Sequence, residues 1–246
     1  MKIALLGGTK GIGRALGRLL AQRGHSLCLL GRSREELVSS ARDMQIRAAG
    51  AREVFVAVCD LLEPEGFEGA LDEASKALEG LDTVIVTAAL FATQDELEGD
   101  IALTRDLVTA NFANTVVFCE EARKRLLASG GGTLCVISSV AGERGRKPVI
   151  IYGASKAGLS AYLEGLDHKF RAHGLRTICV KPGFVKTGMT AGLTPPPFAG
   201  EPEGVAKDIL KGIERGTPVV YTPGMWRYVM LVIRNLPRSV MRRISF

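Results

Sequence analysis

This sequence lacks the cysteine and histidine patterns that build metal or redox sites. Its 246 residues include five cysteines and three histidines, but no CxxC pair and no cysteine–histidine spacing that suits a metal. The cysteines stand singly among apolar neighbours, which favours small core side chains, and the histidines are assigned no role. We therefore expect no metal site. The cysteines are Cys28, Cys59, Cys119, Cys135 and Cys179.

Internal repeats and low-complexity linkers are also missing. The chain opens on the strand-like apolar run Met1–Leu6, with no long apolar segment behind a basic leader, so we expect a cytosolic protein. With 46% hydrophobic residues, a chain of this length can bury one sizeable core. We therefore predict a single main domain.

Acidic residues are absent after Glu214, and this accounts for the whole net charge of +6. Six arginines lie beyond that point, so the remaining Lys and Arg equal the 26 Asp and Glu and the body is formally neutral. Because these arginines alternate with large aliphatic side chains, they do not resemble a surface that follows a phosphate backbone, and we expect no nucleic-acid partner. They are Arg215, Arg227, Arg234, Arg238, Arg242 and Arg243.

Short β-branched or leucine-rich runs alternate with amphipathic stretches along the chain. Strands that are apolar on both faces and separated by helices are typical of a parallel sheet covered on both sides. We therefore predict an α/β fold, a Rossmann-type doubly wound parallel sheet of about seven strands. The predicted strands are residues 2–7, 26–30, 53–58, 82–88, 133–138, 176–180 and 218–221. The predicted helices lie near 11–23, 33–49, 66–79, 100–128, 152–173 and 203–214.

A glycine-rich turn, Gly7-Gly8-Thr9-Lys10-Gly11-Ile12-Gly13, follows the first predicted strand and opens the first predicted helix. Glycines there allow the backbone to turn tightly and to approach a pyrophosphate, whose charge meets the amides and positive dipole of the helix N-terminus. The position of the turn between the first strand and the first helix therefore predicts a dinucleotide site.

The end of the second predicted strand, Gly31-Arg32-Ser33, has no acid where one would hold the 2′-hydroxyl of an adenosine ribose. Arg32 can instead pair with a 2′-phosphate as a fork, and Lys10 can add a second positive charge. We therefore predict NADPH, rather than NADH, as the cofactor. The alternative is that Arg32 is a solvated residue at a turn.

Tyr152 and Lys156 stand four residues apart at the start of a predicted helix, so both side chains emerge on one face, a single turn apart. A phenol titrates near ~10, and an adjacent ammonium favours the phenolate and lowers that pKa toward the working range. Ser139 ends the fifth predicted strand, where its hydroxyl can donate to a carbonyl oxygen held against the Tyr152 hydroxyl. These residues predict the reduction of a ketone, with Tyr152 as proton donor.

Together, the glycine turn, the Ser-Ser strand end and the YxxxK pair resemble the short-chain dehydrogenase/reductase family over the whole chain. The resemblance implies a catalytic set of Ser139, Tyr152, Lys156 and Asn111. In that set Asn111 links Lys156 through water to a proton relay, and Lys156 also holds the nicotinamide ribose.

The resemblance also implies cofactor contacts in two further segments. Asp60 and Leu61, after the third predicted strand, are expected to contact the adenine, and the PGxVxT segment 182–187 is expected to meet the nicotinamide amide. The predicted cofactor-binding residues are Gly7, Thr9, Lys10, Gly11, Ile12, Gly13, Arg32, Ser33, Asp60, Leu61, Ala88, Tyr152, Lys156, Pro182, Gly183, Val185 and Thr187.

The chain departs from the family pattern at two places. Leu6 stands where the family usually has Thr, which removes a local turn contact. Val86-Thr87-Ala88-Ala89 replaces the family's NNAG, so two side-chain amides that tie the sheet together and flank the cofactor are missing. How the chain compensates for them is left open by the sequence.

Three bases, Arg144, Arg146 and Lys147, follow closely after Ser139. They would meet an anionic group of a substrate, or they form an exposed basic loop, and both interpretations stay open. The irregular stretch 186–202, rich in Gly, Thr and Pro, suits a lid over a ligand.

Beyond the predicted catalytic domain, residues 1–224, the chain ends in a basic and apolar extension, residues 225–246. Its apolar stretch is too short to span a bilayer and carries Trp226, Tyr228 and arginines, so a helix here can lie on an anionic membrane surface or over a lipid-accepting cleft. The alternative is an ordinary helix packed on the domain or on a second subunit. We expect a cytoplasmic protein, peripheral at the inner face of the membrane in the first case, and the resemblance implies a homo-oligomer.

LLGGT, SSxAGER, YGxSKAGL and the WRYVMxxxRxxPRS-type ending are similar to a branch of the family that reduces polyprenyl-phosphate-linked keto-sugars. This predicts an NADPH-dependent reductase of a lipid-linked carbonyl substrate. One alternative is the reduction of a soluble carbonyl, such as a 3-oxoacyl thioester or a small ketone. Another is a nucleotide-sensing protein without turnover, which would be expected to lose Tyr152 or Lys156.

Overall fold

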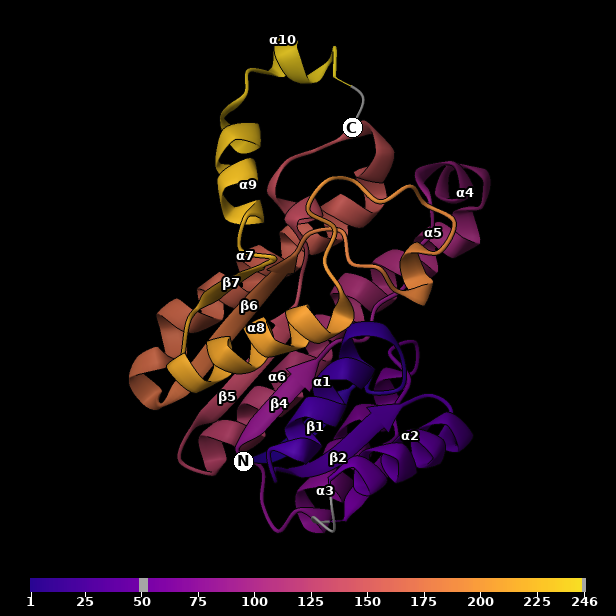
Figure 1. Ribbon diagram of the computed structural model, residues 1–246. Helices are drawn as coiled ribbons and strands as arrows, with labels where there is room; N and C mark the ends of the chain where they lie inside the picture. Colours follow the sequence, from indigo (N-terminus) through magenta and orange to yellow (C-terminus); the bar gives the residue numbers. More distant parts are fainter. Residues whose placement is uncertain (49–52, 245–246) are drawn as a thin grey trace.

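The computed structural model describes residues 1–48 and 53–244, and the strands of this part of the chain form one sheet (Figure 1). The sheet has seven strands in the order β3-β2-β1-β4-β5-β6-β7, and every neighbouring pair is parallel. This confirms the predicted doubly wound α/β fold. The strands are β1 (Lys2–Leu6), β2 (Ser26–Gly31), β3 (Val54–Val58), β4 (Thr83–Val86), β5 (Gly132–Ile137), β6 (Leu175–Pro182) and β7 (Val219–Thr222).

The helices between the strands largely follow the amphipathic stretches of the sequence. They are α1 (Gly11–Gln22), α2 (Arg34–Arg47), α3 (Phe67–Ala77), α4 (Gln94–Gly99), α5 (Ile101–Val108), α6 (Thr115–Ala128), α7 (Ile150–Phe170), α8 (Pro202–Arg215), α9 (Trp226–Asn235) and α10 (Arg238–Met241). The predicted helix 33–49 is α2, and its last residue lies outside the described part of the chain.

Two details of the helix prediction were wrong. The stretch 100–128 is not one α-helix, because a π-helical turn, η2 (Thr109–Asn114), separates α5 from α6. The sequence pattern also missed α4, whose six residues are too few for a periodic signal. α4 begins at a capping box, in which the Thr93 hydroxyl accepts from the Glu96 amide and the Glu96 carboxylate accepts from the Thr93 amide.

The core lies in two layers because successive side chains of a strand point to opposite faces of the sheet. On β1, Ile3 and Leu5 face the layer of α1, α2 and α8, whereas Ala4 and Leu6 face the layer of α3, α6 and α7. Both layers consist of buried apolar side chains, as a parallel sheet requires.

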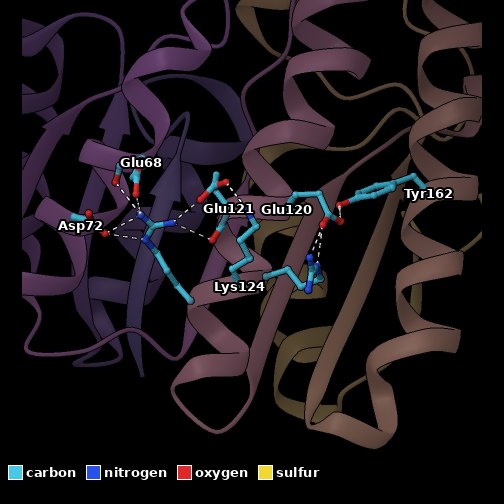
Figure 2. A network of polar contacts seen from close by, with 8 residues as sticks. Glu68, Asp72, Glu120, Glu121, Lys124 and Tyr162 are labelled. Atoms are coloured by element: carbon cyan, nitrogen blue, oxygen red, sulfur yellow. Dashed lines mark hydrogen bonds and ion pairs between the residues drawn. The ribbon is translucent and has the colours of Figure 1, made fainter.

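Polar contacts join the helices of the second layer (Figure 2). Arg125 of α6 donates to Asp72 of α3 at 2.8 Å and to Glu121 at 3.0 Å. The Tyr162 hydroxyl of α7 donates to Glu120 of α6 at 2.8 Å. Because α7 also carries Tyr152 and Lys156, the bond from Tyr162 holds the helix of the predicted catalytic pair against α6.

The strand order reverses direction between β1 and β4. At such a switch point the connections leave on opposite sides of the sheet and open a crevice at the carboxyl ends of the strands, which is where ligands bind in this type of fold. The segments that follow β1 and β4 are Gly7–Gly13 and Thr87–Phe91.

The C-terminal extension begins with α9, which stands beyond the sheet at the top of Figure 1. Trp226 and Met230 are buried against Val140, whereas Tyr228, Leu231 and Val232 are exposed. Among the described residues, no helix combines the length and apolarity needed to cross a bilayer. The boundary at residue 224 stays a prediction, and residues 245–246 of the extension lie outside the described part of the chain.

Candidate active site

A cavity of about 660 Å³ lies at the carboxyl ends of the strands, and the predicted site residues gather around it. Asn111 is the exception, since it is fully buried and does not line the cavity. The predicted residues that line it are Gly7, Thr9, Lys10, Gly11, Ile12, Gly13, Arg32, Ser33, Asp60, Leu61, Ala88, Ser139, Tyr152, Lys156, Pro182, Gly183, Val185 and Thr187.

The glycine turn is packed so closely that side chains would not fit. Gly7 has φ +95°, and a Cβ on it would lie 2.5 Å from the amide nitrogen of Ala88. A Cβ on Gly13 would lie 2.2 Å from the carbonyl oxygen of Gly7. Both positions therefore require glycine, which brings the turn against the segment that follows β4.

The N-terminus of α1 is left open toward the cavity. Its N-cap residue, Lys10, makes no side-chain capping bond, and the first turn contains no acidic residue. The first amides of the helix and the positive end of its dipole are therefore available to an anion. This arrangement fits the pyrophosphate of a nicotinamide dinucleotide.

The nucleotide end of the cavity contains an acid that the sequence interpretation missed. Lys10 forms an ion pair of 2.7 Å with Glu36, a residue of the first turn of α2 that also lines the cavity. The hydrogen bond from Lys10 lowers the pKa of Glu36, and the charge of Lys10, a hydrogen bond with Thr9 and the charge of Arg32 act in the same direction. The spacing of Ser33 and Glu36 in the sequence is that of a capping box, which could have placed Glu36 in the first turn of a helix at this end. In the structure the Ser33 hydroxyl accepts from the Glu36 amide at 3.3 Å.

Asp60 and Leu61 reach the cavity through a turn after β3. The Asp60 carboxylate accepts from the Leu62 amide at 3.0 Å, and the Leu61 carbonyl accepts from the Asn114 side chain at 2.7 Å. These bonds fix the backbone at the place where the resemblance predicts an adenine contact.

Thr87 and Asn111 show how the chain holds the segment after β4 without the family's two amides. The Thr87 hydroxyl donates to the Leu6 carbonyl at 3.0 Å and so ties the end of β4 to β1. Asn111 in the π-helical turn accepts from the Leu90 amide and donates to the Leu90 carbonyl, both at 2.7 Å. The Asn111 side chain therefore holds the segment after β4 at Leu90. The predicted role of Asn111 in a proton relay with Lys156 stays a prediction.

Lys156, Tyr152 and Ser139 meet at the catalytic end of the cavity. The Lys156 ammonium donates to the Ile137 carbonyl at 3.0 Å and lies 5.8 Å from the centre of the Tyr152 ring. The Ser139 hydroxyl accepts from the Ala141 amide at 3.0 Å. Ser138 donates to the Lys156 carbonyl at 2.9 Å, which ties the end of β5 to α7.

Burial dominates the titration of this pair. It raises the pKa of Tyr152 to about 12, while the hydrogen bond with Ser139 acts in the opposite direction. Burial also lowers the pKa of Lys156 to about 8. The pKa of Tyr152 therefore lies above its ordinary value, whereas Lys156 was expected to bring it below that value. At neutral pH Tyr152 carries its proton, as a proton donor must.

Gln94, which sequence reasoning missed, caps the helix that carries the catalytic pair. Its side-chain oxygen accepts from the amides of Ile150 at 2.8 Å and Ile151 at 3.2 Å, at the start of α7. These are two of the amides that a helix N-terminus leaves without an intrahelical partner. Gln94 lies on the short helix α4, so no local sequence signal connects it to α7.

Residues 186–202 form an irregular loop at the catalytic end of the cavity. Its base is closed by the Lys186 amide, which donates to the Gly200 carbonyl at 2.9 Å, and by the Gly200 amide, which donates to Phe184 at 2.8 Å. Met189 and Leu193 of the loop line the cavity together with Trp226 of α9. The catalytic end is therefore largely apolar.

Comparison with known proteins agrees with this geometry. The family model for short chain dehydrogenases matches residues 2–197. The uncharacterized oxidoreductase Rv2073c of Mycobacterium tuberculosis is 32% identical over 243 residues, which cover 98% of this chain and 96% of that protein. Carbonyl reductase family member 4 of Danio rerio is 32% identical over 77% of each chain. The 3-oxoacyl-[acyl-carrier-protein] reductase of Homo sapiens is 27% identical over 77% of this chain and 78% of that protein.

Solved structures share the fold. A short-chain type dehydrogenase/reductase from Mycobacterium ulcerans superposes with a TM-score of 0.80 at 21% identity, over 89% of this chain and 86% of the other. With the family model covering most of the sequence and the glycine turn, Ser139, Tyr152 and Lys156 lining one cavity, the chain belongs to the short-chain dehydrogenase/reductase family of oxidoreductases.

Proposed function

We propose that this protein is an NADPH-dependent reductase that converts a ketone to an alcohol. The observation that carries the proposal is that Ser139, Tyr152 and Lys156 line the same cavity as the glycine turn at the N-terminus of α1. A dinucleotide held at the turn and a carbonyl held at Tyr152 would therefore share one site.

The choice of NADPH is supported by the residues after β2. Arg32 lines the cavity and is exposed, so its guanidinium can turn toward a 2′-phosphate. Lys10 forms an ion pair with Glu36 at the start of α2, which places a second cation at the nucleotide end of the cavity, near Arg32. Glu36 opposes a phosphate by its charge, but its carboxylate is already matched by Lys10.

The residues at the catalytic end would divide the work of reduction. When bound, NADPH supplies a hydride to the carbonyl carbon of the substrate. Tyr152 donates its phenolic proton to the carbonyl oxygen, so that hydride plus proton give the alcohol. Ser139 donates a hydrogen bond to the same oxygen and steadies its developing negative charge. Lys156 holds the nicotinamide ribose and provides a positive charge beside the Tyr152 phenolate that remains.

For the substrate, we propose a polyprenyl-phosphate-linked keto-sugar. The support is the resemblance of the motifs LLGGT, SSxAGER, YGxSKAGL and the WRYVMxxxRxxPRS-type ending to decaprenylphosphoryl-2-keto-ribose reductase. The apolar lining from the loop 186–202 and α9 supports a substrate with a lipid part. A second candidate is a 3-oxoacyl thioester or a small ketone, which is favoured by the similarity to carbonyl reductase family member 4 and to 3-oxoacyl-[acyl-carrier-protein] reductase.

The test is NADPH consumption with a polyprenyl-phosphoryl 2-keto-pentose, measured beside a 3-oxoacyl thioester and a short soluble ketone. Turnover confined to the lipid-linked sugar would support the first substrate. Turnover confined to a soluble carbonyl would support the second and leave the oxidoreductase chemistry in place. Absence of turnover with all three would contradict both substrate proposals.

We also propose that the C-terminal extension contacts an anionic membrane surface. The exposed face of α9 presents Tyr228, Leu231 and Val232, and the extension contains arginines but no acid. Such a helix can bury its apolar face at the headgroup boundary while its arginines meet anionic lipid. The homo-oligomer implied by the family stays a prediction.

Vesicle flotation tests the membrane contact. The wild type is expected to float with vesicles of phosphatidylglycerol and phosphatidylcholine and not with phosphatidylcholine alone. Leu231→Asp with Val232→Asp should abolish flotation, whereas Ile101→Asp, at a residue 78% exposed on α5, should not. Loss of flotation in both variants, or no flotation of the wild type, would contradict the proposal.

A further inference from the structure

The three bases that follow Ser139 in the sequence have different positions in the structure. The Arg144 guanidinium donates to the Leu236 carbonyl at 2.7 Å, and so joins this segment to the end of α9. Lys147 is exposed and does not line the cavity. Arg146 is half-buried and lines the cavity. The structure therefore singles out Arg146 from a segment in which the sequence left all three bases equivalent.

Arg146 belongs to the catalytic end of the cavity. The segment leaves β5 at Ser139, passes through a short 3₁₀ turn (Val140–Glu143), and returns through a second turn (Lys147–Val149) to α7, which carries Tyr152. The carboxyl ends of β5 and β2 are three strands apart in the sheet. At the usual spacing of about 4.8 Å per strand this is roughly 14 Å, so the charge of Arg146 is separate from that of Arg32.

The charged residues that line the cavity also differ between its nucleotide end and its catalytic end. Of the described residues that line it, the acids are Glu36 and Asp60, which follow β2 and β3 at the nucleotide end. At the catalytic end the lining cations are Lys156 and Arg146. Lys156 is 2% exposed and donates to the Ile137 carbonyl. Arg146 is thus the lining cation that a substrate can reach beside Tyr152.

The surroundings of Arg146 strengthen its attraction for an anion. The catalytic end is lined by apolar side chains, namely Phe91, Val149, Phe184, Met189, Leu193 and Trp226. Arg146 is half-buried, so water hydrates its guanidinium less than that of an exposed arginine, and this burial lowers its pKa. A charge pair in such an environment is screened less than a pair on the surface.

We propose that Arg146 determines substrate specificity by binding an oxyanion, a carboxylate or a phosphate, that is carried by the ketone substrate. The substrate class is then an anionic ketone with an apolar part, since the guanidinium and the apolar lining share one end of the cavity. The inference rests on the proposed reductase function, and it adds a group on the substrate that the reaction itself does not require.

The experiment compares ketones that differ only in charge. The two pairs are 4-oxodecanoate with its methyl ester and dihydroxyacetone phosphate with dihydroxyacetone, which separate a carboxylate from a phosphate. The variants are Arg146→Gln, Arg146→Lys and, as a matched control from the same segment, Lys147→Gln. The protein is used as the full chain with NADPH.

The wild type is expected to prefer the charged member of at least one pair. Arg146→Gln should lower kcat/KM for that member by about 10- to 100-fold, mainly through KM, because a hydrogen bond to a charged group is lost. In Arg146→Gln, kcat/KM for the neutral member and the affinity for NADPH should stay unchanged. Lys147→Gln should behave as wild type, and Arg146→Lys should keep part of the preference for the charged member. Equal losses for charged and neutral ketones, or a wild type that prefers both neutral members, would overturn the proposal.

A binding measurement separates this inference from the proposed function. Trp226 is the single tryptophan of the chain and lines the cavity, so its fluorescence reports occupancy without turnover. If no ketone is reduced, a fluorescence change with the charged members that Arg146→Gln abolishes would sustain the anion site while the reductase proposal fails. A response that Arg146→Gln leaves intact would overturn the anion site even in an active enzyme.

Discussion

Among the residues that the structure describes, each end of the cavity is lined by two cations, but their surroundings differ. At the nucleotide end, the Lys10 side chain is 75% exposed and paired with Glu36, and Arg32 is also exposed. At the catalytic end, Lys156 is 2% exposed and Arg146 is half-buried. The first pair of cations can exchange partners at little cost because water solvates them, whereas the second pair is held by the protein.

The difference suits the two ends for different tasks. Exposed cations can add binding energy for a phosphate, while burial changes the pKa values of Tyr152 and Lys156. Burial is therefore coupled to proton chemistry at Tyr152 and Lys156, whereas the proposed role of the exposed Lys10 and Arg32 is binding alone. The following variants test this division, beginning with the largest expected effect.

Tyr152→Phe removes the proposed proton donor at the catalytic end. We expect the rate of ketone reduction to fall by about 100- to 10,000-fold, the usual contribution of a positioned acid, with NADPH affinity nearly unchanged. Steady-state kinetics and NADPH fluorescence titration measure the two quantities. Tyr228→Phe, at an exposed tyrosine of α9, is the control and should behave as wild type. Retained turnover in Tyr152→Phe would remove the proton-donor assignment.

Lys156→Met tests whether the charge of Lys156 is buried at the catalytic end, through the pH dependence of the free energy of unfolding. Because burial lowers the Lys156 pKa from 10.5 to about 8, the folded chain loses this proton before the unfolded chain does. Between about pH 8 and 10.5 the unfolded state holds one proton more, so the contribution of Lys156 to stability increases with pH across this window.

Relative to Lys156→Met, the free energy of unfolding of the wild type should therefore rise by up to about 3 kcal/mol as the pH increases through that window. Urea denaturation at several pH values measures it. The same comparison with Lys147→Met, at an exposed lysine, should show no such rise. A wild type and Lys156→Met that change in parallel would show that Lys156 is not desolvated.

Arg32→Asp and Glu36→Gln act at the nucleotide end in opposite directions. Arg32→Asp should weaken the binding of NADPH by about 10- to 100-fold and the binding of NADH much less. The reason is that the substitution replaces a partner of the 2′-phosphate by a negative charge that repels it. Glu36→Gln should tighten NADPH by only about 2- to 5-fold, since its carboxylate is exposed and already paired with Lys10. Equal effects on NADPH and NADH in either variant would refute the phosphate contact.

The features that the sequence predicted well depend on short stretches of backbone. Short apolar runs separated by amphipathic stretches predicted all seven strands. This was possible because the side-chain periods of strands and helices are local properties of the chain. The glycine turn was predicted because its position between strand and helix is contiguous in sequence. Tyr152 and Lys156 were paired correctly on one helix face because they lie one turn apart.

Other features needed the tertiary structure. Gln94 caps α7 from 56 residues away, and Glu36 pairs with Lys10 across 26 residues. No local pattern encodes such partners. α4 and the π-helical turn η2 were also missed, since each has only six residues, too few for a periodic signal.

By itself, then, the sequence determined the sheet, the glycine turn and the placement of Tyr152 and Lys156 on one helix, because each follows from the geometry of neighbouring residues. The tertiary structure alone decided which of the three bases after Ser139 lines the cavity and how Thr87 and Asn111 hold the segment after β4. It also decided that burial raises the pKa of Tyr152, which Lys156 was expected to lower. These properties depend on burial and on distant partners, which exist only once the chain has folded.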